Sequence, residues 1–237
     1  MRLTVLTTET LHHAYFLHEL GKRFDISAVV IETRTAKPVF EISHPFESAR
    51  EDFERDICFA GRGIRISDFA ETFYVESVND RKTVALLNRM SPDVIVVFGT
   101  GIVRPPVIQA APGRILNLHG GDPEYYRGLD SHLWAIYHQD FAALVTSLHH
   151  VNAELDDGDI ILQSPIKIPH GAGLHELRYH NTNVCIELTI AALSMYADLG
   201  NFLSRPQRKR GRYYSYMPAC LKDICVEKFE RYAGERR

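Results

Sequence analysis

The chain has 237 residues, of which 45% are hydrophobic and 24% are charged, and its formal net charge is -3. This length and composition predict a folded globular protein with a sizeable core and exclude the disordered and fibrous classes. The near-neutral charge provides no long-range field for nucleic acid, so we expect no DNA partner. No apolar run approaches twenty residues, so we expect a cytoplasmic protein without membrane insertion.

Predicted strands and helices alternate along the chain. Short apolar runs rich in β-branched residues predict strands at residues 3–8, 26–33, 93–99, 114–119, 144–151 and 159–168. Helix-like patterns occupy residues 11–23, 44–60, 81–90, 131–141 and 174–201. The alternation predicts an α/β, Rossmann-like fold in which helices cover both faces of a mostly parallel sheet.

The end of the last of these helices divides the chain into two parts. Residues 1–201 form the main predicted domain, and residues 202–237 form a short aromatic and basic C-terminal extension. In this extension, residues 210–232 predict a strand or hairpin followed by a short helix. The basic run RPQRKRGR (205–212) has two interpretations, a solvated loop or a contact with a phosphate-bearing substrate.

Several common site types are missing from the sequence. The first predicted turn, TTETLHH (7–13), has no glycine, which excludes the Gly-rich loops of dehydrogenases and nucleotide hydrolases. His149 and His150 must point to opposite sides of a strand, so they cannot form one ligand face, and we expect no metal. The cysteines show neither CxxC nor zinc spacing, so we expect reduced thiols at Cys58, Cys185, Cys220 and Cys225.

Polar residues follow three of the predicted strands, whose interiors are otherwise hydrophobic. They are FGTGIVRPP (98–106), NLHGGDPEYYRGLDS (117–131) and AELDDGDI (153–160). Open α/β sheets bind ligands outside the carboxyl ends of their strands. We therefore expect these three segments to border one site.

Asn117 and His119 lie two residues apart at the end of a predicted strand, so their side chains point to the same face. Together with a carboxylate they form a set suited to acyl transfer. The imidazole handles protons, the carboxylate orients and charges it, and the amide binds a developing oxyanion. From the residues alone, structural roles for Asn117 and His119 and a solvated turn at 156–159 stay open. No serine or cysteine nucleophile accompanies the set, which indicates that the substrate amine attacks.

Three segments carry a resemblance to a known family. Asn117-Leu118-His119, the loop PEYYRG (123–128) and LDDGDI (155–160) resemble the NxH, YRG and DxGDI signature of folate-dependent formyltransferases. The segment DVIVVFGTGIVRPP (93–106) resembles the part of that family that precedes the NxH strand. The resemblance covers residues 90–168, a third of the chain, and its three motifs occur in the family's order and spacing.

The resemblance implies transfer of a formyl group from 10-formyltetrahydrofolate to an amine, with residues 1–201 as the catalytic domain. It carries over Asn117, His119 and Asp156 as the catalytic trio. In this scheme Asn117 and protonated His119 stabilise the oxyanion, and Asp156 holds the imidazolium and assists proton transfer. Whether Asp157 shares this role stays open. The folate is implied to contact Phe98, Gly99, Thr100, Gly101, Val103, Val151, Glu154 and Leu155.

Three departures from the family's pattern bear on the amine. The glycine-free turn at 7–13 differs from glycinamide ribonucleotide formyltransferases, and FGTG and the short tail differ from methionyl-tRNA formyltransferases. His119 is followed by Gly120-Gly121-Asp122 in place of the family's Pro-Ser. The chain is most similar to nucleotide-sugar N-formyltransferases. These act on nucleotide-linked 4-amino-4,6-dideoxy sugars, such as GDP-perosamine and its dTDP-linked equivalents, in lipopolysaccharide O-antigen synthesis.

On this interpretation, a sugar nucleotide is the partner, and the predicted substrate contacts are His13, Asp122, Tyr126 and Arg127. Packing under the loop is the alternative for Tyr126, and an exposed helix start is the alternative for His13. Other functions also stay open: formylation of methionyl-tRNA or hydroxyornithine, formyltetrahydrofolate hydrolysis, or a non-catalytic folate-binding relative. The oligomeric state, including a homodimer, is also open.

Overall fold

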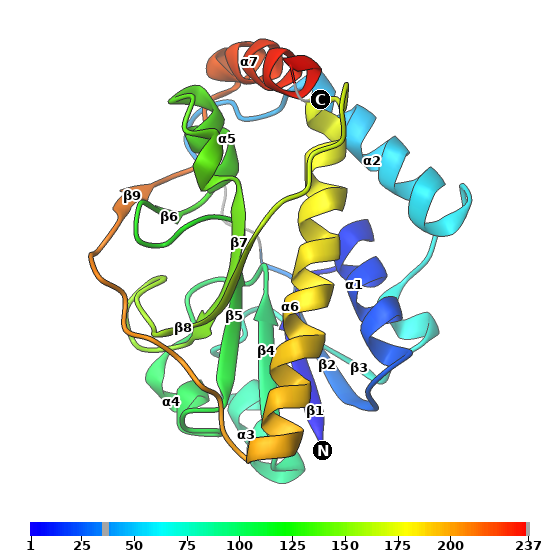
Figure 1. The fold of residues 1–237 in the computed structure, drawn as a ribbon. Coiled ribbons are helices and arrows are strands. Elements are labelled where there is room, and N and C mark those ends of the chain that lie inside the picture. Colours follow the sequence, from blue (N-terminus) through cyan, green and yellow to red (C-terminus); the bar gives the residue numbers. More distant parts are fainter. Residues whose placement is uncertain (35–37, 236–237) are drawn as a thin grey trace.

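The computed structural model describes residues 1–34 and 38–235. Within these residues, seven strands form a sheet in the order β3-β2-β1-β4-β5-β7-β8 (Figure 1). Their bounds are β1 Leu3–Thr7, β2 Ile26–Glu32, β3 Thr72–Val75, β4 Val94–Phe98, β5 Ile115–His119, β7 Val145–His150 and β8 Ile160–Pro165. Strands β1 to β5 are parallel, and β7 is antiparallel to both of its neighbours. The predicted mostly parallel sheet is confirmed.

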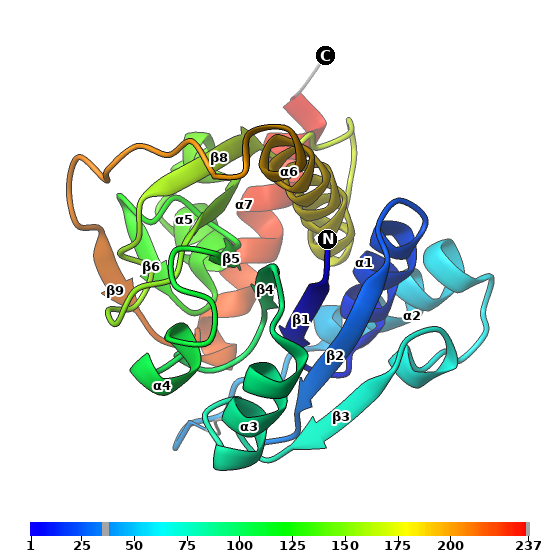
Figure 2. The ribbon, with the colours of Figure 1, turned by 90° about the horizontal axis from the view of Figure 1, so that it is seen from below.

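Helices cover both faces of this sheet, as predicted (Figure 2). The helices of the main sheet are α1 Leu11–Gly21, α2 Pro45–Phe59, α3 Arg81–Met90, α4 Pro105–Ile108 and α6 Leu177–Leu199. Helices α1 and α6 pack on one face, and α3 and α4 pack on the other. Every residue of β1 and β4 is buried, because strands covered on both sides have no solvent-facing side chains.

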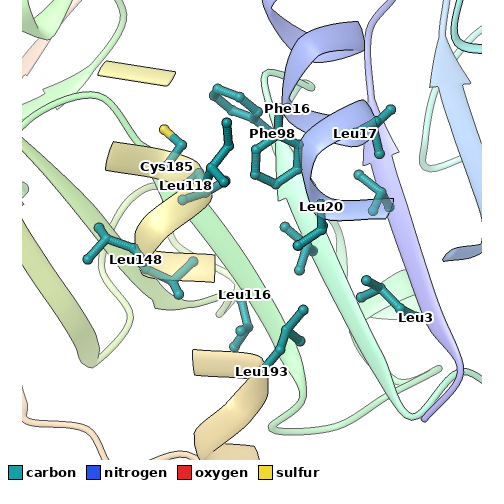
Figure 3. Close-up of a cluster of buried hydrophobic side chains, with 14 of the residues drawn as sticks. Leu3, Phe16, Leu17, Leu20, Phe98, Leu116, Leu118, Leu148, Cys185 and Leu193 are labelled. Carbon is teal, nitrogen blue, oxygen red and sulfur yellow. The ribbon is translucent and has the colours of Figure 1, made fainter. Parts of the chain in front are cut away.

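The larger core lies under α1 and α6 (Figure 3). Leu116 and Leu118 of β5 point into it, beside Phe98 and Cys185. A second cluster lies between the sheet and helices α3 and α4, and it includes Ile115 at the start of β5. Alternate residues of β5 therefore face opposite helical layers, which determines where the polar residues of this strand point.

The C-terminal residues pack beside the sheet on α5 (Ser131–Tyr137). Strand β9 (Arg212–Tyr214) pairs in parallel with β6 (Tyr126–Gly128), and α7 (Lys222–Glu235) contacts α5. These elements share a third apolar cluster. The extension was predicted to begin with a strand or hairpin, and β9 is a single strand whose partner precedes it by more than eighty residues.

Several elements were not predicted from the sequence. They are β3, β6, α4 and the 3-10 turns at Ile66–Asp68, Phe141–Ala143, Leu174–Glu176 and Ala219–Leu221. All are three or four residues long, and so short a segment contains too little periodicity to be recognised. No helix in the described part of the chain has both the length and the apolarity to cross a membrane.

Candidate active site

Asn117 and His119 point away from the larger core, because Leu116 and Leu118 fill it. On this other face, α3 and α4 cover the sheet only as far as β4 and the start of β5. The loop of residues 151–159, which joins β7 to β8, crosses the face next to β5. It brings Asp156 to within 3.4 Å of Asn117 and 3.6 Å of His119.

The loop of residues 151–159 reaches the site by a different path from the one that the sequence predicted. The segment after Val151 was expected at the same sheet edge as the ends of β4 and β5. Because β7 is antiparallel, its carboxyl end lies beside Leu116, at the opposite end of β5. The loop turns back over the sheet, so it does border the site, through a return path that the sequence pattern does not contain.

Both imidazole nitrogens of His119 face acceptors. Nε2 lies 2.8 Å from the carbonyl oxygen of Tyr126, and Nδ1 lies 3.6 Å from Oδ2 of Asp156. A carbonyl and a carboxylate can only accept hydrogen bonds, so the protonated imidazolium is the form that satisfies both sides. The arrangement can therefore hold a positive charge beside Asn117.

Asp156 is almost fully buried at the centre of the trio. Burial by itself would raise the pKa of this carboxyl. The charges of His119 and His149 and the backbone N–H of Gly128, which donates to Oδ2 at 2.8 Å, outweigh it and lower the pKa below its usual range. Asp156 is therefore a carboxylate throughout the physiological pH range.

His149 also belongs to this cluster. Its Nε2 lies 3.1 Å from Nδ2 of Asn117 and 3.6 Å from Oδ1 of Asp156. The sequence predicted that His149 and His150 point in opposite directions, and His149 is buried whereas His150 is not fully buried. The sequence did not indicate which of the two faces the site, because that depends on the register between β5 and β7.

The backbone of Asp156 adopts φ 47°, a left-handed conformation that is uncommon for residues other than glycine. Side chains from other segments of the chain stabilise this backbone conformation. Nε2 of Gln207 donates to the carbonyl oxygens of Asp156 and Gly158, each at 2.9 Å. The guanidinium of Arg127 donates to the carbonyl of Leu155. The C-terminal extension therefore contributes to the position of the predicted catalytic carboxylate.

Asp157 faces the extension and not His119. Its Oδ1 lies 3.7 Å from Nε of Arg210, which also contacts Glu154 at 2.9 Å. In the same basic run, Arg205 contacts Glu124 at 2.8 Å, and Nζ of Lys209 lies 3.2 Å from the ring centroid of Tyr125. These members of the run bind acidic and aromatic side chains of the same chain.

A cavity of about 560 Å³ opens beside the trio. Asn117, His119 and Asp156 line it, together with all eight residues predicted to contact the folate. These eight are Phe98, Gly99, Thr100, Gly101, Val103, Val151, Glu154 and Leu155. The volume is within the range of small-molecule sites, and the extended loops offer backbone donors and acceptors suited to a pterin. The residues present fit a folate.

The family of formyl transferases matches this chain over residues 17–188, which is most of its length. The chain belongs to that family. Among curated proteins, it is 35% identical over 105 residues to phosphoribosylglycinamide formyltransferase of Escherichia coli, covering 44% of this chain and 48% of the relative. It is 28% identical over 141 residues to methionyl-tRNA formyltransferase of Rickettsia felis, covering 59% and 45%. The chain thus spans about half the length of these relatives.

Solved structures show the same fold. A 4-N formyltransferase from Francisella tularensis has a TM-score of 0.62 at 14% identity, over 95% of this chain and 86% of that one. The formyltransferase PseJ from Anoxybacillus kamchatkensis has a TM-score of 0.52 at 19% identity, over 90% and 85%. The latter was solved with UDP-4,6-dideoxy-4-formamido-L-AltNAc and tetrahydrofolate.

In this formyl transferase chain, hydrogen bonds with two side chains from other segments stabilise the turn after β4. The carboxylate of Glu32 accepts from the backbone N–H groups of Gly101 at 2.7 Å and Val78 at 3.0 Å. The amide of Asn79 donates to the carbonyl of Ile102 at 2.9 Å and accepts from the N–H of Arg104 at 2.7 Å. Neither Glu32 nor Asn79 was predicted, because neither is near the turn in sequence.

Of the four predicted substrate contacts, His13 lines the cavity. Its Nδ1 lies 2.9 Å from the carbonyl oxygen of Thr8, and burial lowers its pKa to about 3, so the ring is neutral. The ring packs against Gly99, where an added Cβ would come within 2.4 Å of it at a φ of +79°. Glycine is therefore required at this point of the turn.

The other three predicted contacts have partners within the chain and lie outside the cavity lining. Asp122 accepts from the backbone N–H of Glu124, and Tyr126 donates its hydroxyl to Asp140 at 3.1 Å. Arg127 is buried and donates to Leu155. Their contact with a substrate stays a prediction, and their positions in this structure support the loops around the trio.

One part of the cavity wall, the charged end, contains five charged residues that sequence reasoning missed. They are Glu47, Arg50, Asp130, Arg178 and Lys222. They come from α2, the turn before α5, α6 and α7, segments that share no motif. Only the packing of these elements against each other brings the five side chains together.

Proposed function

We propose that this chain transfers the formyl group of 10-formyltetrahydrofolate to the amine of a nucleotide-linked 4-amino-4,6-dideoxy sugar. The observation that carries formyl transfer is the gathering of Asn117, His119 and Asp156 at one cavity that all eight predicted folate contacts also line. Residues separated by almost forty positions meet there in the arrangement that acyl transfer requires.

When bound, the folate supplies a formyl group on a nitrogen that can leave. As the substrate amine attacks, Nδ2 of Asn117 and the charge of the His119 imidazolium stabilise the negative charge that develops on the formyl oxygen. Asp156 faces Nδ1 of His119, orients the imidazolium and takes part in moving the proton that the amine loses to the leaving nitrogen of the folate. Each such contribution is typically worth on the order of a hundredfold to a thousandfold in rate.

Two considerations support a sugar nucleotide as the acceptor. PseJ and the Francisella 4-N formyltransferase resemble this chain over most of both lengths, and PseJ was solved with a 4-formamido sugar nucleotide. The wall of the 560 Å³ cavity also includes the charged end in addition to the trio, so the site offers contacts for more than an amine. Sequence identity is highest to a glycinamide ribonucleotide enzyme among the relatives described above, so that substrate is a necessary comparison.

The experiment is a formyl-transfer assay with purified protein and 10-formyltetrahydrofolate. The acceptors are dTDP-, GDP- and UDP-linked 4-amino-4,6-dideoxy sugars, glycinamide ribonucleotide, methionyl-tRNA and hydroxyornithine, with buffer alone as the control. We expect tetrahydrofolate release together with a formyl mass gain on one sugar nucleotide. A gain on another amine would refute the sugar assignment. Release without any mass gain would identify a hydrolase, and no release would refute catalysis.

A further inference from the structure

Two cations that line the charged end, Lys222 and Arg178, each pair with a carboxylate. Nζ of Lys222 lies 2.8 Å from Oε1 of Glu47. The guanidinium of Arg178 contacts both oxygens of Glu54, at 2.5 and 2.6 Å. Because these four groups are matched, they leave no cation or acid over for a ligand.

Arg50 has no such partner. Among the residues that the structure describes, no carboxylate lies within ion-pair distance of it, and its Nε is buried without a hydrogen-bond partner. Its guanidinium lies 5.6 Å from the ring centroid of Phe46, on the cavity wall. Burial lowers the pKa of Arg50 and the neighbouring charge of Arg178 lowers it further, whereas the more distant carboxylates of Glu47, Glu54 and Asp130 raise it. An unpaired, partly desolvated guanidinium beside a second cation is electrostatically suited to an anion.

Asp130 is the other unmatched group at this end. Its Oδ2 accepts from the backbone N–H of Met217 at 2.8 Å, and within the described chain no cation lies within ion-pair distance of it. It is close enough to Arg50 for its charge to act on the pKa of the arginine. One carboxylate oxygen is left to accept a hydroxyl hydrogen bond. The end therefore provides one unpaired cation and one unpaired acceptor.

We propose that this end of the cavity is a phosphosugar subsite, in which Arg50 binds a phosphoryl group of the acceptor and Asp130 accepts from a sugar hydroxyl. The inference rests on the proposed function and names a part of the acceptor other than the amine. A guanidinium donates two parallel hydrogen bonds to phosphoryl oxygens, a geometry that lysine lacks. The phosphoryl group belongs either to a nucleoside diphosphate or to a simple phosphate monoester.

The test measures binding by calorimetry, using the wild-type chain and Arg50→Met with four probes. The probes are dTDP, GDP, inorganic pyrophosphate and ribose 5-phosphate, and the matched control is Arg55→Met on the same helix. Arg55 lies outside the cavity lining and pairs with Asp52. We expect Arg50→Met to weaken the tightest phosphate probe at least tenfold and Arg55→Met to change it less than twofold. If dTDP or GDP binds most tightly, the phosphoryl group belongs to a nucleoside diphosphate. If ribose 5-phosphate binds most tightly, it belongs to a phosphate monoester.

A second variant and a second ligand keep the result interpretable. Arg50→Lys preserves the charge without the fork and should give intermediate affinity, with an unchanged melting temperature. Binding of 5-formyltetrahydrofolate should be the same in all variants, since Arg50 is not among the eight predicted folate contacts. Three results would overturn the subsite. They are a wild-type chain that binds no phosphate probe, an Arg55→Met variant whose affinity for the probes falls as much as that of Arg50→Met, and an Arg50→Met variant that loses affinity for folate alone.

The two proposals can fail separately. Formyl transfer to an amine without a phosphate, by a chain that binds none of the phosphate probes, would overturn the subsite and leave formyl transfer standing. Phosphate binding that depends on Arg50, in a chain that transfers no formyl group, would leave the subsite standing and overturn the function.

Discussion

Two loops border the predicted folate site, and they are supported by different parts of the chain. The turn at 99–103 is held by Glu32 at the end of β2 and by Asn79 in the turn after β3. The loop at 151–159 is held by Arg127, Gln207 and Arg210, mostly from the C-terminal residues. The first support lies next to the parallel strands, and the second depends on a segment outside the sheet. Because the second loop also carries the predicted folate contacts Val151, Glu154 and Leu155, only substitutions that act on its Asp156 end should affect catalysis without affecting folate binding.

The largest effect should come from the carboxylate itself. Asp156→Asn preserves the size of the side chain but replaces the carboxylate that faces Nδ1 of His119 with a neutral amide. We expect turnover to fall at least a hundredfold, as loss of a proton-handling group does, with tetrahydrofolate affinity nearly unchanged. Steady-state kinetics and folate titration would measure both. Near-normal turnover by a folded variant would contradict the role of the trio.

Gln207→Leu should have the next largest effect. The substitution removes two hydrogen bonds, each typically worth about 1 kcal/mol, from a backbone held in a left-handed conformation. We expect kcat to fall about tenfold while the KM for folate changes less than twofold. The exposed Gln109→Leu is the matched control. If both substitutions had the same effect, the extension would not position Asp156.

Glu32→Gln should give the opposite pattern. Its carboxylate accepts two backbone N–H groups, and an amide in its place would direct an NH₂ group at one of them. We expect the KM for folate to rise about fivefold, with kcat changed less than twofold. Asn79→Ala removes the second support of the turn and should act in the same direction. A loss in kcat alone would place Glu32 with the other loop.

The smallest effect concerns acid stability. His13 beside the folate turn has a pKa lowered to about 3, compared with about 6.5 in an unfolded chain. Between these values the unfolded state binds the extra proton, so stability falls as the pH falls. From pH 7.5 to 5.5, His13 should cost about 1 kcal/mol of unfolding free energy. Urea denaturation should show this loss in the wild type and a smaller one in His13→Asn. Equal losses would exclude His13 as the cause.

From the residues alone, the alternation of strands and helices and the shared face of Asn117 and His119 could be predicted. Both are local properties, since strand period and helical period are written in neighbouring positions. The family resemblance also predicted eight folate contacts; all eight residues line one cavity, and their contact with folate stays a prediction. Except for β9, the elements of three or four residues were not predicted, because so few positions carry no periodic pattern.

Only the tertiary structure decided how Asp156 reaches Asn117 and His119 and which charged residues line the rest of the cavity. The antiparallel β7 and its returning loop bring Asp156 to His119, and the register with β5 selects His149 over His150. Arg50 and Asp130 come from different elements and share no motif. Whether an arginine is neutralised depends on which carboxylates pack near it, and contacts between distant segments determine that. Sequence periodicity specifies the faces of an element, and packing specifies its neighbours.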